Sequence, residues 1–154
     1  MAEEIKDISL SHRKNFRIDG DDNRMLSLDV SDMNVLTRLE EAYPRMQKFA
    51  VEASDKVSSS KDVSDEESLN EFTELLKDID KKMRDEIDYI FDSNVSEVCV
   101  PSGTMYDPYN GQFRFEHIIS VLTDLYANNL TAEFKKMQTN VKKHTAKYTS
   151  KRKR

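Results

Sequence analysis

Three polar side chains near the N-terminus have the spacing of a calcium-binding loop. Asp19, Asp21 and Asn23 occupy positions one, three and five of an EF-hand loop. The sixth position of such a loop needs glycine but holds Arg24, and the twelfth needs a bidentate glutamate but holds Val30. Because the flanking residues alternate as in strands, we interpret this segment as a turn and not as a calcium site.

The residues that most often perform catalysis are scattered along the chain. His12, His117 and His144 do not form an i, i+4 pair, which a metal site on a helix would favour. Cys99 is the single cysteine and lies between two valines, so it excludes an intramolecular disulfide and suits a buried, unreactive thiol in a reducing compartment. The three glycines never cluster into a phosphate-binding loop or a nucleophile elbow. We therefore predict no catalytic residue, no cofactor and no metal, and a protein that is not an enzyme.

The charge of the chain is strongly segregated. The formal net charge is −5, but residues 135–154 contain nine Lys and Arg and no acidic residue, so the preceding residues carry −14. Such a tail can contact a polyanion or an acidic protein surface. It contains only one aromatic residue, Tyr148, on which a nucleic-acid base could stack. The candidate polyanion contacts are Lys142, Lys143, Lys147, Lys151, Arg152, Lys153 and Arg154. We favour acidic protein or solvent over nucleic acid, which stays as an alternative.

Amphipathic helices account for most of the remaining sequence. From Ser64 to Asp92 the apolar residues recur every three or four positions, which predicts a long helix, and Ser64 with Glu67 has the spacing of a capping box. Its apolar stripe comprises Leu69, Phe72, Leu76, Ile79, Met83, Ile87 and Ile90. The intervening charged residues, including Asp80, Arg84 and Asp88, are predicted to form a solvated face.

A β-hairpin and a second helix are predicted before this helix. Residues 15–18 and 24–30 alternate in polarity around the turn residues 19–23, which gives an apolar face of Phe16, Ile18, Leu26, Leu28 and Val30. Ser31 can cap the following helix. Its predicted apolar face is Met33, Leu36, Leu39, Tyr43, Met46 and Ala50. The spacing continues through Pro44, which favours one kinked helix over two shorter ones.

The serine-rich residues 54–63 predict a mobile loop, and residues 95–112 predict a short buried or extended segment followed by two turns. Aromatic residues crowd into and beside the second region. This loop either packs onto the helices or contacts a partner, and we select Tyr106, Tyr109 and Phe113 as candidate partner-binding residues.

The final predicted helix begins near Phe115, and a break at Asn128 and Asn129 is considered. Its apolar stripe is Ile118, Leu122, Leu125, Leu130, Phe134, Met137 and Val141. Beyond this stripe the helix is expected to fray.

The predicted fold class is mainly α, with three long amphipathic helices, a short N-terminal hairpin and an aromatic-rich loop before the last helix. The predicted organisation is a flexible lead-in at 1–14, a single domain at 15–141 and a basic tail at 142–154. The mixed, acidic N-terminus predicts no signal peptide, and the chain has no run of about 18 apolar residues that could span a bilayer. We therefore expect a cytosolic protein with no membrane partner.

Three stretches resemble small helical proteins of phage and prophage tail modules in Gram-positive bacteria, in particular tail assembly chaperones. They are Asn15-Phe-Arg-Ile-Asp-Gly-Asp-Asp-Asn23, Phe91-Asp-Ser-Asn-Val95 and Phe113-Arg-Phe-Glu-His-Ile118. The hairpin, the following helix that begins Asp32-Met-Asn-Val-Leu-Thr-Arg-Leu39, the charged helical body and the lysine-rich end share this order of elements. The resemblance carries no site residues.

The resemblance implies a non-enzymatic protein of the bacterial host cytoplasm. Its partner would be a long helical tape measure protein, which it would cover until tail tube protein assembles around it. The alternatives are a nucleic-acid-binding accessory protein that acts through its basic tail, and a structural, homo-oligomeric tail or head-tail component located in the virion.

Overall fold

The fold is mainly α, as predicted. The computed structural model describes residues 3–10, 12–59 and 65–152, and describes side chains up to residue 140. The elements are β1 (Arg13–Ile18), β2 (Asp21–Asp29), α1 (Asn34–Ser58), α2 (Glu66–Phe91), the short α3 (Val95–Cys99), β3 (Pro108–Tyr109), β4 (Gln112–Phe113) and α4 (Arg114–Arg152). Three long helices, an N-terminal hairpin and an aromatic region before the last helix are all present.

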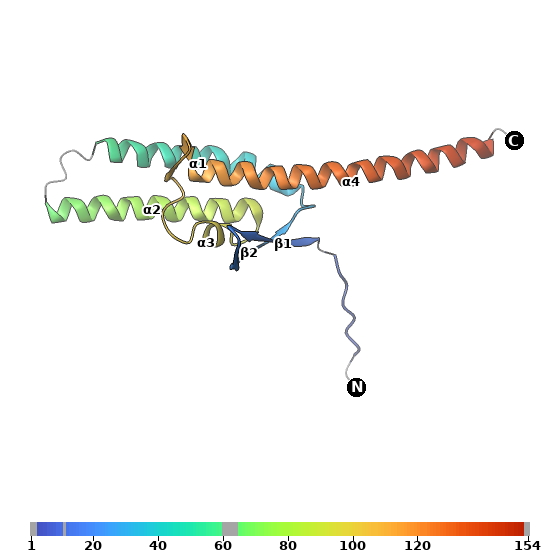
Figure 1. Ribbon diagram of the computed structural model, residues 1–154, viewed down its shortest axis with the longest axis horizontal. Coiled ribbons are helices and arrows are strands. Elements are labelled where there is room, and N and C mark those ends of the chain that lie inside the picture. Colours follow the sequence, from blue (N-terminus) through green and yellow to red (C-terminus); the bar gives the residue numbers. More distant parts are fainter. Residues whose placement is uncertain (1–2, 11, 60–64, 153–154) are drawn as a thin grey trace.

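The helices α1 and α2 form an antiparallel pair, and α4 lies beside α1 for only part of its length (Figure 1). The ring of Tyr43 on α1 contacts that of Phe115 near the start of α4, with centroids 6.2 Å apart. At the other end of this contact Asn129 Nδ2 donates to the carbonyl oxygen of Val30, at 3.1 Å. Beyond Asn129, α4 projects away from the rest of the molecule.

The N-terminal hairpin is held in register by its turn and by the core. Asp19 and Gly20 both have positive φ angles, 53° and 70°, as a two-residue type I′ turn requires. Its turn is thus shorter than the predicted 19–23. Leu26, Leu28 and Val30 are buried, so the predicted apolar face is confirmed. Phe16 and Ile18 are half-buried and pack against the same core.

The prediction for α1 was wrong at its first turn. Ser31 does not cap this helix: its backbone N–H donates to Asp29, and Asp32 Oδ1 instead accepts from the N–H of Asn34 at 2.9 Å. Met33 and Leu36 are exposed, because Val35 takes the inward position in this turn. The helix continues through Pro44 as a single element, in agreement with the preferred interpretation.

The N-cap of the long helix α2 lies one residue later than predicted. Asp65 is the N-cap, and its carboxylate accepts from the N–H of Ser68 at 2.7 Å. Ser64, the predicted cap, lies outside the described residues. Ile79, Met83, Ile87 and Ile90 are buried as predicted, whereas Leu69 is exposed.

The end of α1, the segment after α2 and the helix α4 each differ in part from their predictions. Residues 54–58 of the predicted mobile loop are the last turn of α1, and residues 60–64 lie outside the described residues. The segment predicted to be buried or extended is buried at Val95 and Val100, and it forms the short helix α3 instead of an extended strand. The helix α4 passes Asn128 and Asn129 without a break, and its backbone is helical to Arg152, where fraying was expected.

The core contains one polar atom that lacks a hydrogen bond within the described part of the chain. The Tyr126 side chain is 2% exposed, and its hydroxyl has no partner there. Burial raises the pKa of this hydroxyl to about 12. An unpaired buried hydroxyl costs about 1 kcal/mol or more. We therefore expect Tyr126→Phe to raise the free energy of unfolding by about 1 kcal/mol in urea denaturation, and a destabilised variant would contradict this assignment.

Candidate partner-binding site

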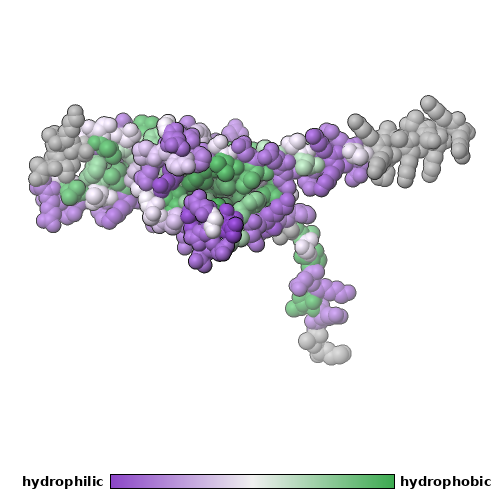
Figure 2. Space-filling model, viewed as in Figure 1, coloured by the Kyte–Doolittle hydropathy of each residue, from purple (hydrophilic) through white to green (hydrophobic). Residues whose placement is uncertain are grey.

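A central hollow opens where the β1–β2 hairpin, the loop after α3 and the start of α4 meet. Its volume is about 430 Å³. The apolar side chains that line it are Ile18, Val121, Ile118, Leu122, Pro101 and the half-buried Cys99. The polar side chains are Arg17, Asp19, Arg24, Ser102, Tyr109, Arg114 and His117. Figure 2 shows an apolar hollow at the middle of the molecule, surrounded by hydrophilic residues.

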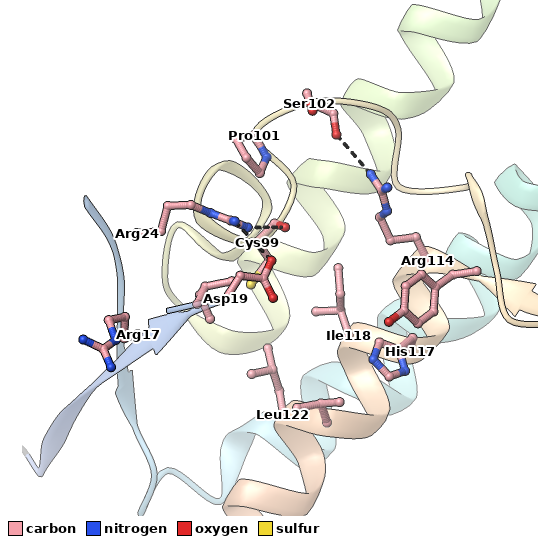
Figure 3. A pocket seen from close by; sticks show the side chains of 13 residues that line it. Arg17, Asp19, Arg24, Cys99, Pro101, Ser102, Arg114, His117, Ile118 and Leu122 are labelled. Carbon is pink, nitrogen blue, oxygen red and sulfur yellow. Dashed lines mark hydrogen bonds and ion pairs between the residues drawn. The ribbon is translucent and has the colours of Figure 1, made fainter. Parts of the chain in front are cut away.

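Arg24 fixes one side of the central hollow. Its guanidinium donates to the carbonyl oxygens of Val98 and Cys99, at 2.9 and 3.0 Å, and forms an ion pair with Asp19 at 3.1 Å (Figure 3). The two carbonyls belong to the C-terminal end of α3, where a positive charge is favourable. The hairpin and α3 are therefore joined by one half-buried side chain.

Arg84 on α2 fixes the loop that forms the opposite side. Its guanidinium donates to the carbonyl oxygens of Ser96, Val100 and Gly103, at 3.0 to 3.2 Å. Asp80 accepts from Arg84 Nε and, through its other oxygen, from the N–H of Met105, each at 2.7 Å. These two side chains of one helix pair with each other and bond four backbone groups, so the loop is held on the helical body.

The end of this loop is attached to the start of α4. Arg114 Nη1 donates to the carbonyl oxygen of Ser102 at 3.0 Å and lies 3.6 Å from a carboxylate oxygen of Asp107. The N–H of Phe115 donates to the carbonyl oxygen of Met105 at 2.8 Å. These contacts position Arg114 and His117 along the edge of the central hollow (Figure 3).

Asp88 performs a similar task at the beginning of α3. Its carboxylate accepts from the N–H and the hydroxyl of Ser96, at 2.7 and 2.8 Å. Burial raises the pKa of Asp88, although both hydrogen bonds from Ser96 oppose this rise. Asp80, Arg84 and Asp88 were predicted to lie on a solvated face, and that prediction was wrong: all three are half-buried and hold the segment that follows α2.

The structure separates the three aromatic residues selected from the sequence. Tyr109 lines the central hollow, is 40% exposed and lies beside His117, with ring centroids 4.5 Å apart. Tyr106 is half-buried, and its hydroxyl donates to the carbonyl oxygen of Leu76 at 2.8 Å. Phe113 is half-buried and stacks on Phe115 at 5.9 Å. The loop therefore packs onto the helices and leaves Tyr109 as its most accessible aromatic side chain.

The described side chains that line the central hollow offer apolar contact and charge. Burial raises the pKa of the Cys99 thiol to about 11, so the thiol is protonated at neutral pH and is a poor nucleophile. No group of three or more His, Cys, Asp or Glu in the described ranges is placed to hold a metal ion. The basic residues from Lys142 to Arg154 cannot be placed, because their side chains lie outside the described part.

Sequence reasoning missed the apolar floor of the central hollow. Ile118 and Leu122 were assigned to the last helix as core residues, and both also line this surface. Val121 was not selected, although it is 47% exposed at the same place. A signal was available: Ile118, Val121 and Leu122 widen the apolar stripe of the helix beyond what one neighbouring helix can cover.

Comparison of the chain with protein-family models, with curated proteins and with solved structures gave no match. Among the described residues, no helix is both long and apolar enough to cross a membrane.

Proposed function

We propose that this protein is a non-enzymatic chaperone of phage tail assembly that binds an amphipathic helical segment of a tape measure protein in the central hollow. The observation that carries this proposal is an accessible apolar surface at the centre of a strongly charged molecule. Isolated exposed apolar residues are normal, but a hollowed group of them with a polar rim is typical of a binding surface.

The construction of the hollow supports binding in preference to structural filling. Its sides are fixed by Arg24 and Arg114 through hydrogen bonds to backbone carbonyls. Little conformational entropy is therefore lost when a partner binds. Its floor offers the exposed Val121 and the half-buried Ile118, with the buried Leu122 beside them, and these can contact residues repeated every three or four positions along a helix. Arg17 at the rim, which pairs with the exposed Asp22 at 2.9 Å, can also meet an acidic residue flanking that stripe.

The test of this function is co-expression with the tape measure protein encoded in the same tail module. We expect the chain to raise the soluble yield of that protein and to co-purify with it. Unchanged solubility together with no co-purification would contradict the proposal.

Val121→Glu is the sharpest variant for locating the binding surface. It places a carboxylate on the apolar floor, where burial against a partner leaves the charge unpaired. We expect at least a tenfold loss of affinity and little change in stability, because Val121 is 47% exposed. Leu69→Glu is the matched control, since Leu69 is similarly exposed but lies at the start of α2. Equal binding by both variants would move the site elsewhere.

A further inference from the structure

The projecting half of α4 carries an apolar stripe that no other described part of the chain covers. Phe134 and Met137 are 41% and 57% exposed, and Leu130 is half-buried. These residues continue one helical face from Ala127, at steps of three and four. Along this part of α4 every residue from 131 to 140 is exposed, so no other described element packs there.

An apolar groove lies farther back along the same side of the molecule, between α1 and α4. Its lining residues are Leu36, Leu39, Glu40, Tyr43, Pro44, Glu116, Ile119 and Ser120, and its volume is about 550 Å³. Glu116 and Ser120 precede Ala127 on the helical face that carries Leu130 and Phe134. The stripe and the groove therefore share one side of a single helix.

The chain cannot place its own stripe in its own groove. Ser120 and Phe134 belong to one unbroken helix and are about 21 Å apart along its axis, at 1.5 Å per residue. A helix from another molecule is required. We propose that the occupant is α4 of a second copy, which lies antiparallel to the first so that each stripe enters the groove of the other copy.

The positions match around a two-fold axis at Ala127. In this arrangement Ala127 meets its own counterpart, Leu130 lies opposite Thr123 and Asp124, and Phe134 faces Ser120. The large residues of one copy thus meet small residues of the other, which allows close helix packing. The contact is self-complementary, as a closed dimer requires.

Length and charge also fit a second copy. The projecting residues 130–152 of α4 equal in number residues 36–58 of α1, along which they would extend. Within one chain, α4 does not reach the end of the molecule formed by the C-terminus of α1 and the start of α2 (Figure 1). Lys135 and Lys136, the described basic residues of the projecting part, would approach Glu116 and Glu40 in the groove of the other copy. The central hollow lies on the opposite side of α4, so dimerisation leaves it open.

Sedimentation equilibrium of the full chain tests this interface. We expect twice the chain mass, and we expect Phe134→Glu to weaken the dimer at least tenfold by placing a charge against Glu116 and Ser120 of the other copy. Met25→Glu is the control, because Met25 is similarly exposed on the hairpin. No other described element packs on Phe134, which is 41% exposed, so its variant should keep the wild-type unfolding curve. A monomer at all concentrations, larger assemblies, or a dimer insensitive to Phe134→Glu would overturn the proposal.

Cysteine cross-linking locates the axis independently. In a Cys99→Ser background, Ala127→Cys should form a covalent dimer in high yield with a short bismaleimide, and Val121→Cys on the opposite side of α4 should not. Cross-linking through Val121 and not through Ala127 would overturn the proposed arrangement, while leaving the function of the central hollow to its own test.

Discussion

Replacement of Arg84 by leucine is expected to lower the free energy of unfolding by about 3 kcal/mol, because it leaves the half-buried Asp80 without its ion-pair partner. The carbonyl oxygens of Ser96, Val100 and Gly103 lose their donor at the same time. Urea denaturation measures the loss of stability, and hydrogen exchange of residues 100–107 should report a loosened loop. Partner binding should fall with it, since this loop forms one side of the central hollow.

Arg45→Leu is the matched control for this variant. Arg45 also pairs with a carboxylate through two nitrogens, at 3.0 and 2.8 Å from Glu86, but its side chain is far more exposed than that of Arg84. Exposed ion pairs contribute little to stability. A similar loss for both variants would show that Arg84 acts as an ordinary surface charge.

Leu28→Ala is expected to cost about 3 kcal/mol, the usual range for deleting a fully buried leucine side chain. Leu28 lies on β2 and packs in the common core, so the cavity would open beneath the hairpin. The same urea titration measures this loss. We expect one cooperative transition at lower denaturant concentration, because the hairpin and the helices share that core.

Met25→Ala changes an exposed residue of the same strand and should alter stability by no more than about 0.5 kcal/mol. If Leu28→Ala instead melted the hairpin in a separate early transition, the hairpin would be an appendage and could not define one side of the central hollow.

The parts of the fold that follow from local sequence were predictable. The alternation of residues 15–18 and 24–30 around Asp19-Gly20 specifies a hairpin, because side-chain period and turn chemistry agree. The stripe from Ile79 to Ile90 specifies the buried face of α2 in the same way. Met33 and Leu36 were wrongly predicted to face the core, because an apolar residue at the correct spacing does not reveal which of two adjacent faces the rest of the molecule will cover.

The site was harder to predict, because its decisive contacts join residues far apart in the sequence. Asp80 and Arg84 have the i, i+4 spacing of an exposed helical pair, and nothing local shows that a later loop will place its carbonyls beside them. Tyr106 and Tyr109 are near neighbours in the same loop, yet one is tied to α2 and the other lines the central hollow. Three-dimensional placement, and not residue type, separates their roles.

We propose that a partner helix occupies the central hollow. Hydrogen exchange of the chain alone and in its complex with the tape measure protein tests it most directly. We expect slower exchange in residues 17–24, 99–109 and 114–122 upon complex formation, and little change at the start of α2. A complex that forms with no protection in those three segments would contradict the claim.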